Sequence, residues 1–391
     1  MTNKDRMKTV KMDALLDRAG RKAWANKLTL EEIAIALFDE SAPALSELER
    51  SLMDNSLRSL VRNIESRIIA EAAGRRDAPK GFAGLFRPSR FTQGAAASRD
   101  HENGHAFAIL EKAGLLRETG LIEAIKHRMQ THRLTLALRR LRRESSIASL
   151  MEDSQSSIIQ SLLVSPAPES VDQLKSFIDS ESDRKDAFQY PLIRPVDLPP
   201  SVMKQLCWWI AAALRQYANS HADIVSGSVD SCFEQATKAV LDRLGDESAP
   251  ASEAEGVIGV LIAGGRFSPD LLLQLLSQGE VSLFEAGFAK ITGLRKILVS
   301  RLLYETGGES LAVACKAAGF DTAGFATIYG YTRHGRLTAD PDQTENQDIV
   351  DFYDDTEQDD AEAVLERWRH DADFLYAIKL LKQAEDNTEA L

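Results

Sequence analysis

Apolar residues recur three and four positions apart along most of this chain of 391 residues, the spacing that places side chains on one face of an α-helix. The run from Leu45 to Ile68 follows this spacing and predicts one long or broken helix. Strict alternation of apolar and polar residues, which marks a half-buried strand, is nearly absent. The sequence therefore predicts an all-α protein in which helices of about 10–14 residues are joined by short turns.

Proline, glycine and charge divide this train of helices into segments. Residues 1–73 are predicted as N-terminal helices, residues 105–164 as a first helical lobe, and residues 199–336 as a second lobe. The other segments are predicted as a flexible basic loop with glycine and proline at 74–104, a linker at 165–198, an acidic linker at 337–359 and a C-terminal helix at 360–384.

A weak internal repetition accompanies this pattern. Gly114 and Gly265 each begin a turn that leads into a short apolar helix. Helix pairs that cannot bury both faces alone stack on their neighbours, which is the principle of an α-solenoid. We therefore expect an irregular, α-solenoid-like array in two lobes.

The net charge of −12 belongs to one segment. Residues 337–366 contain twelve acidic residues and no basic one, so the rest of the chain has equal numbers of both. General nucleic-acid binding requires clustered Lys and Arg for counterion release, so this composition argues against it. The acidic segment is interpreted as a solubilising tether or as a segment that docks on a basic surface.

Cysteine usage and hydropathy indicate a cytoplasmic protein. Cys207, Cys232 and Cys315 are far apart and odd in number, which is no disulfide framework and favours a reducing compartment. The first residues lack the apolar core of a secretory signal. No stretch approaches the roughly 18–20 apolar residues of a membrane-spanning helix.

One motif raises the question of zinc catalysis. His101-Glu102-Asn103-Gly104-His105 matches H-E-x-x-H, in which two His one helical turn apart bind zinc and the Glu acts as general base. Asn-Gly is a turn-forming pair, and the motif leads out of the predicted loop. We interpret it as a chance match at a polar helix start, with Asp100 or Asn103 as the cap.

Other catalytic patterns do not stand out in the sequence. It contains no glycine-rich phosphate loop and no nucleophile elbow. Neither a catalytic set of Ser, His and Asp nor a pair of carboxylates for acid–base catalysis can be recognised in it. The sequence thus predicts no catalytic, metal or cofactor-binding residue, and a protein that is not an enzyme.

A basic stripe lies at residues 126–143, which contain no acidic residue. Its members are Lys126, Arg128, Arg133, Arg139, Arg140, Arg142 and Arg143. Such a stripe serves as a solvated helix face, as a surface for a protein partner or for the acidic segment 337–366, or as a site for a nucleotide or nucleic acid. These alternatives stay open at this point.

Two further features are candidates for recognition. Residues 311–333 predict two helices joined by a turn at Gly319, a helix-turn-helix-like pattern. The second helix would start at Asp321, whose charge repels phosphate, so ordinary helix packing is favoured over DNA reading. Trp208 and Trp209 point about 100° apart on a helix; we expect one in the core and the other in a groove or an interhelical contact.

Two stretches carry a resemblance to a known family. They are Leu198–Arg215, with its Trp208-Trp209 pair, and Leu271–Arg333, with Ser282-Leu283-Phe284-Glu285 and Ala314-Cys315-Lys316-Ala317-Ala318-Gly319. They resemble the bacterial domain-of-unknown-function family 2336, seen mainly in alphaproteobacteria, and Phe107–Arg133 resembles its earlier repeats more loosely. The resemblance implies a HEAT-like helical repeat protein. It implies no known activity, so no catalytic residue is carried over.

These observations favour a non-enzymatic cytoplasmic adaptor or regulatory protein that binds a protein partner through a helical-repeat surface. The alternative is a regulator that binds a nucleotide, a phosphorylated ligand or DNA. Its site would be the basic stripe 126–143 or the helix-turn-helix-like segment 311–333.

Overall fold

The structure is a computed structural model, and its description covers most of the chain. The described residues are 30–39, 42, 44–75, 86, 104–148, 159, 168–221, 226–247, 252–305, 307–336, 344–370 and 374. Within these ranges the regular structure is helical, and the one extended pairing is an isolated antiparallel bridge between Lys185 and Pro191. The predicted all-α class is confirmed, whereas the repeat arrangement stays a prediction.

The chain forms two compact units, each built from segments that are not consecutive. The N-terminal unit takes residues 28–132 and 171–256, and the C-terminal unit takes residues 133–170 and 257–391. The sequence placed a single boundary at 165–198, so the division differs from the prediction. Periodicity identifies the buried face of a helix but not the helix against which that face packs.

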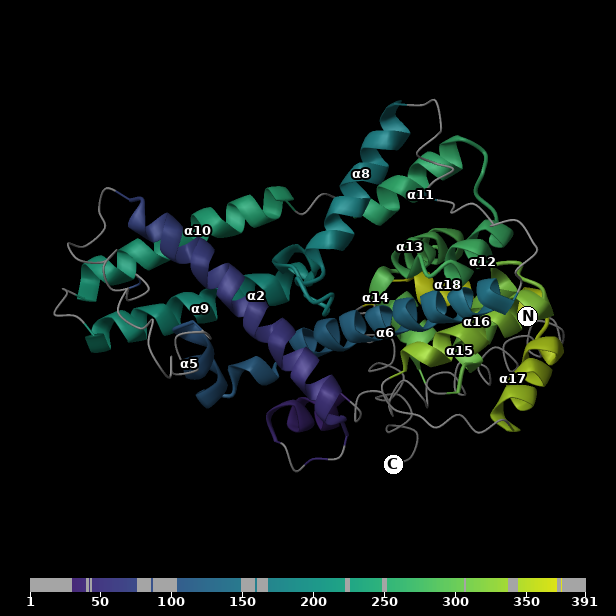
Figure 1. Cartoon of the computed structure of the whole chain (residues 1–391), viewed down its shortest axis with the longest axis horizontal. Coiled ribbons are helices and arrows are strands. Elements are labelled where there is room, and N and C mark those ends of the chain that lie inside the picture. The colour runs from purple at the N-terminus through teal and green to yellow at the C-terminus, as the bar shows by residue number, and fades with distance from the viewer. Residues whose placement is uncertain are drawn as a thin grey trace, which may run out of the picture. The chain divides into compact units, whose positions relative to one another are not determined.

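The N-terminal unit is organised around α2 (Glu47–Ala73), the long helix predicted from the spacing of its apolar residues. A capping box begins it: Ser46 Oγ accepts from the Glu49 N–H, and the Glu49 carboxylate accepts from the Ser46 N–H. Its buried face packs on α5 (Ala106–Lys112), α9 (Pro200–His221) and α10 (Ser226–Glu247) (Figure 1). Helices distant in sequence thus share one core.

A helix occupies part of the predicted linker 165–198. Helix α8 (Pro168–Asp183) buries Leu174 and Phe177, which lie three positions apart on one face. The prolines of this region suggested a break, but proline is well tolerated in the first turn of a helix, and α8 begins at Pro168. The 3₁₀ turn η2 (Pro195–Asp197) then leads to α9.

Helix α6 (Thr119–Ala148) follows the 3₁₀ turn η1 (Leu115–Arg117) and contributes its first part to the N-terminal unit and its second part to the C-terminal unit. Helix α11 (Glu253–Ala263) likewise spans the division at residue 256. The remaining elements of the C-terminal unit are α12 (Pro269–Ser277), α13 (Val281–Thr292), α14 (Lys296–Tyr304), α15 (Glu309–Ala317), α16 (Thr322–Thr332), η3 (Arg333–Gly335), α17 (Thr344–Asp355) and α18 (Gln358–Arg369).

The acidic segment is folded where the structure describes it. Helix α17 lies in the predicted linker 337–359, and α18 begins near the predicted start of the C-terminal helix at 360. Most of residues 371–384 lies outside the described residues. Both helices pack on α15, and Ile349, Tyr353 and Val364 are buried (Figure 1). The apolar face of these helices was hard to recognise among so many acidic residues. Apart from the buried Asp360, the acidic side chains whose burial is described in α17 and α18 are exposed.

Candidate functional site

The basic stripe does not form one surface. Arg128 is buried in the N-terminal unit, where its guanidinium donates to the carbonyl oxygens of Leu192 at 3.0 Å and Arg184 at 2.7 Å. Lys126 is partly buried and Arg133 is exposed. Arg140 is 82% exposed and lies 3.9 Å from Glu144. A buried guanidinium that bonds two carbonyls serves the fold, so Arg128 leaves the set of candidate binding residues.

The other members lie on the second part of α6. Arg139, Arg142 and Arg143 line a cavity of about 330 Å³ together with Gln278 and Glu280, which belong to the turn between α12 and α13. Arg139 forms an ion pair with Glu280 at 3.6 Å. The structure therefore brings three of the seven predicted bases together.

The H-E-x-x-H segment leads into helix α5, and the predicted caps Asp100 and Asn103 lie outside the described residues. His105 and Ala106 direct their N–H groups at the carboxylate of Glu65, at 2.8 and 3.1 Å. Glu65 is buried in α2, so the cap of α5 comes from another helix. His101 to Asn103 lie outside the described residues. Within the described part of the chain, no three His, Cys, Asp or Glu side chains are grouped as metal ligands would be.

The helix-turn-helix-like segment consists of α15, a turn at Gly319, and α16. Asp321 is the N-cap of α16, and its side chain accepts from the Gly324 N–H at 2.7 Å. Thr322 at the start of α16 donates to Asp354 of α17. Acidic groups from two helices thus surround the end of α16 that a DNA reader would present, which argues against DNA reading.

The predicted groove aromatics Trp208 and Trp209 lie on α9, and both are partly buried. The fully buried face of α9 is made by other residues, among them Leu206, Cys207 and Ile210. Neither tryptophan occupies the centre of the core.

Phe188, the most exposed aromatic side chain among the described residues, belongs to a short loop between α8 and η2. We call residues 184–192 the aromatic loop. Phe188 is 78% exposed and Tyr190 is 45% exposed, and their ring centroids are 6.1 Å apart. Adjacent exposed aromatic rings on an ordered backbone are typical of interaction sites, because burying them in a partner removes a large apolar area from water.

Local hydrogen bonds fix the backbone of the aromatic loop. Asp186 Oδ1 accepts from the N–H groups of Phe188 at 2.8 Å and Tyr190 at 2.9 Å. The Asp186 N–H donates to the Tyr190 carbonyl at 3.0 Å. Gln189 has φ of +66°, a left-handed conformation that costs a residue with a side chain roughly 1–2 kcal/mol. Such strain persists only where surrounding bonds determine the conformation.

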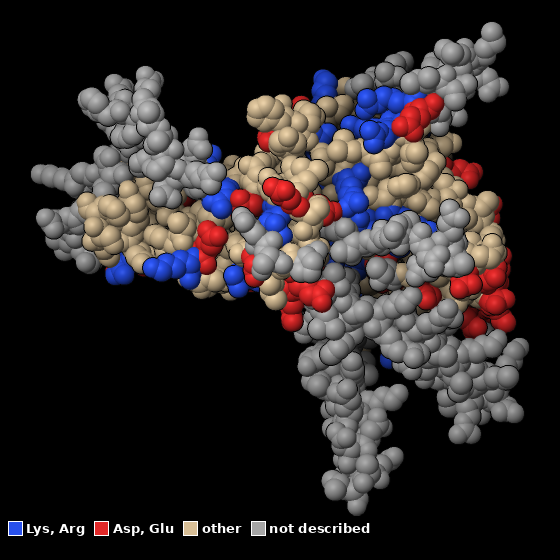
Figure 2. Space-filling view, turned by 60° about the horizontal axis from the view of Figure 1, so that its bottom comes forward, with Lys and Arg blue, Asp and Glu red and all other residues tan. Residues whose placement is uncertain are grey.

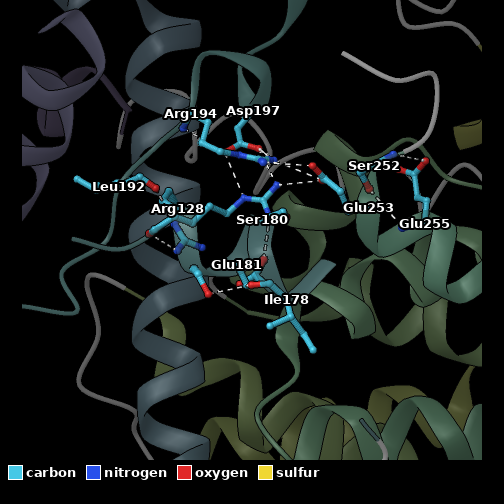
Figure 3. A network of polar contacts seen from close by, with 12 residues as sticks. Arg128, Ile178, Ser180, Glu181, Leu192, Arg194, Asp197, Ser252, Glu253 and Glu255 are labelled. Atoms are coloured by element: carbon cyan, nitrogen blue, oxygen red, sulfur yellow. Dashed lines mark hydrogen bonds and ion pairs between the residues drawn. The ribbon is translucent and has the colours of Figure 1, made fainter. Parts of the chain in front are cut away.

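A partly buried network of charges holds the stems of the aromatic loop (Figure 3). Arg184 pairs with Asp197 at 2.7 Å and with Glu181 at 2.9 Å. Arg194 pairs with Asp197 at 3.1 Å and with Glu253 of α11 at 3.1 Å. The two guanidiniums therefore share one carboxylate, and each has a second acidic partner.

The electrostatics of this network favour the ionised carboxylates. Burial alone would raise the pKa of Asp197, but the charges and hydrogen bonds of Arg184 and Arg194 hold that pKa well below its ordinary value. Burial is likewise outweighed at Glu253, whose pKa is lowered by its bonds to Arg194. Arg128 completes the support, because it binds the Arg184 and Leu192 carbonyls at the two stems (Figure 3).

Sequence reasoning missed this site. The aromatic loop falls within the segment predicted as linker. The available signal was a Phe and a Tyr two positions apart, Phe188 and Tyr190, within a polar stretch that begins with Arg184 and Asp186. That signal carries no information on exposure, which decides whether aromatic residues belong to a core or to a surface.

Comparison with known proteins identifies the family alone. A family described as an uncharacterised protein conserved in bacteria (DUF2336) matches residues 106–366. No curated protein and no solved structure matches the chain. The matched region contains the aromatic loop, the charge network and the arginine-lined cavity. The match spans well over half of the sequence, and the chain belongs to the DUF2336 family.

Proposed function

We propose that this protein is a non-enzymatic cytoplasmic adaptor or regulatory protein that binds a protein partner through its aromatic loop. In this proposal Phe188 and Tyr190 insert into an apolar pocket of the partner. The observation that carries it is the exposure of Phe188, 78%, on a loop whose stems are held by partly buried ion pairs. A loop fixed before binding loses little conformational entropy when the complex forms.

The charges beside the loop indicate the character of the partner surface. Asp179 and Asp183 on α8 are exposed, and Asp186 is partly buried within the loop. Lys185 of the loop offsets one of these charges, whereas Arg184 and Arg194 are bound to acidic partners of their own. A pocket whose rim carries Lys or Arg would complement these carboxylates and disfavour acidic competitors.

Among the described residues, no helix has the length and apolar character needed to cross a membrane.

Site-specific photocrosslinking tests the proposal. A photoreactive phenylalanine analogue replaces Phe188 in the full chain, expressed in the bacterium in place of the native copy. The matched control carries the analogue at Leu48, an exposed apolar residue of α2 in the same unit. We expect position 188, but not position 48, to crosslink one protein in high yield.

Binding of that purified protein then gives the decisive measurement. Truncating an aromatic anchor typically costs about 2 kcal/mol or more, about a 30-fold loss of affinity, so Phe188→Ser should weaken binding at least that much. Leu48→Ser should leave the affinity unchanged. Equal affinity of the Phe188→Ser variant and the unmodified protein would overturn the proposed function.

A further inference from the structure

The cavity on the second part of α6 is a site distinct from the aromatic loop. Its lining residues are Arg139, Arg142, Arg143, Gln278 and Glu280, all in the C-terminal unit. The cavity is open to solvent, and its volume of about 330 Å³ lies at the lower end of the range of small-molecule sites. Figure 2 shows Lys and Arg in blue and Asp and Glu in red. Acidic side chains gather at its right-hand edge, which is also the side of Figure 1 on which α17 lies.

Helical spacing explains why three guanidiniums meet here. Residues three and four positions apart lie on one helix face, and Arg139, Arg142 and Arg143 have this spacing on α6. Arg140 points elsewhere, and its side chain is 82% exposed. The cavity thus selects three of four neighbouring arginines.

The turn between α12 and α13 supplies the opposite wall. Gly279 has φ of +76°, and a Cβ at this position would lie 2.9 Å from Cγ of Arg139 and 3.4 Å from the Thr135 carbonyl oxygen. Only glycine lets the turn approach α6 this closely. The side chains of Gln278 and Glu280 flank this glycine, which fixes them opposite the arginines.

The charges of the cavity favour an anion. Among the described residues that line the cavity, three carry a guanidinium and one carries a carboxylate, and this Glu280 pairs with Arg139 at 3.6 Å. Arg143 Nε donates to the Arg139 carbonyl at 3.4 Å. Each guanidinium has five N–H donors, so these bonds leave Arg139 and Arg143 with further capacity. Arginine is the side chain best suited to binding phosphate oxygens in pairs.

We propose that this cavity binds a small phosphorylated molecule that also carries hydroxyl groups, as a sugar phosphate or a nucleotide does. Arg139, Arg142 and Arg143 would bind the phosphate. The Glu280 carboxylate repels a bare anion but accepts hydrogen bonds from hydroxyl groups, and the Gln278 amide both donates and accepts. The combination selects a ligand with a phosphate at one end and hydroxyls at the other.

Calorimetric titration of the full-length protein tests this site. The probes are ribose 5-phosphate, inorganic phosphate and ribose, each at about 50 and 200 mM salt. Ribose 5-phosphate should bind more tightly than inorganic phosphate, ribose should not bind, and the affinity should fall with salt because the exposed part of each ion pair is screened. Equal affinity for both phosphates would overturn the role given to Glu280 and Gln278.

Two variants with equal changes of charge locate the site. Arg142→Gln should weaken binding of ribose 5-phosphate at least tenfold, whereas Arg140→Gln on the same helix should leave it unchanged. Absence of binding by the unmodified protein, or equal losses in both variants, would overturn the proposal. Tighter binding of single-stranded DNA through Arg142 would also overturn it, since the ligand would then be a polymer. Phe188→Ser should not affect this titration, so the two proposals fail independently.

Discussion

The ring of Tyr353 lies flat against the ring of Phe325, with their centroids 4.5 Å apart and their planes 6° from parallel. Tyr353 belongs to α17 of the acidic segment, and Phe325 belongs to α16. The Tyr353 hydroxyl donates to the Phe320 carbonyl, and Lys316 donates to the Tyr353 carbonyl at 3.2 Å. A helix within a strongly acidic segment is therefore anchored by one buried aromatic side chain.

Loss of this anchor should destabilise the C-terminal unit. Tyr353→Ala removes a fully buried ring and should lower the free energy of unfolding by about 3–5 kcal/mol. Tyr353→Phe keeps the stacking and loses one hydrogen bond, so its cost should be about 1–3 kcal/mol. Urea denaturation monitored by circular dichroism measures both. Equal, small losses in the two variants would show that the ring contributes little.

The helices could be predicted from the sequence because burial of one face imposes its own spacing. Helix α2 shows this: its apolar spacing and the Ser46–Glu49 capping box are both local signals. The helices that pack on α2 could not be predicted, because α9 and α10 lie far along the chain. The apolar spacing of a helix shows which face is buried but not which other helix covers it. For the same reason each unit combines segments that are not consecutive in the chain, whereas the sequence suggested two consecutive lobes.

The candidate sites show the same limit. The basic stripe included Arg139, Arg142 and Arg143, whose helical spacing is visible in the sequence and which line the cavity on α6. It also included Arg128, whose acceptors are the carbonyls of Arg184 and Leu192, more than fifty residues away. Every residue has a backbone carbonyl, so the sequence does not show which carbonyls accept from a given arginine. A buried structural arginine and an exposed binding arginine therefore look alike in sequence.

The carboxylate of Asp197 should make stability depend on acidic pH. Its pKa is lowered in the folded state, so its contribution to stability is complete above its unfolded pKa of about 3.9. That contribution is lost as the pH falls below this value toward the folded pKa, because protonation then breaks the pairs with Arg184 and Arg194.

Asp197→Asn isolates this contribution. The variant removes the carboxylate that the two partly buried guanidiniums share. Arg184 keeps Glu181 and Arg194 keeps Glu253, so the cost at neutral pH should be about 1–3 kcal/mol. The difference from the unmodified protein should shrink as the pH is lowered from about 5 to 2, since the unmodified carboxylate is then protonated as well. Denaturant titrations across this range measure the difference, and a constant difference would contradict the lowered pKa.

Arg128 should act as a structural support. Arg128→Met removes a donor from each of two partly buried loop carbonyls. The Leu192 N–H still donates to the Arg184 carbonyl at 2.9 Å, so the Leu192 carbonyl loses its donor, at a cost of about 1–3 kcal/mol. Arg140→Met on the same helix is the control, and its effect should lie within about 0.5 kcal/mol because the side chain is exposed. Urea denaturation measures the two variants. If Arg140→Met lowered the free energy of unfolding as much as Arg128→Met does, the effect would come from removing a positive charge and not from losing the bonds to the loop carbonyls.

Asp186 should determine the order of the aromatic loop with little effect on global stability. Asp186→Ala removes the acceptor of the Phe188 and Tyr190 N–H groups, so hydrogen exchange of these two amides should accelerate at least tenfold. Asp183→Ala, an exposed change at the end of α8, should leave their exchange unchanged. Asp186→Asn retains a side-chain oxygen and should restore most of the protection.

If the partner binds a preformed loop, Asp186→Ala should also weaken binding while both aromatic side chains are still present, because the loop must then lose conformational entropy when the complex forms. Unchanged affinity in this variant would show that the aromatic rings, and not the fixed backbone, determine binding.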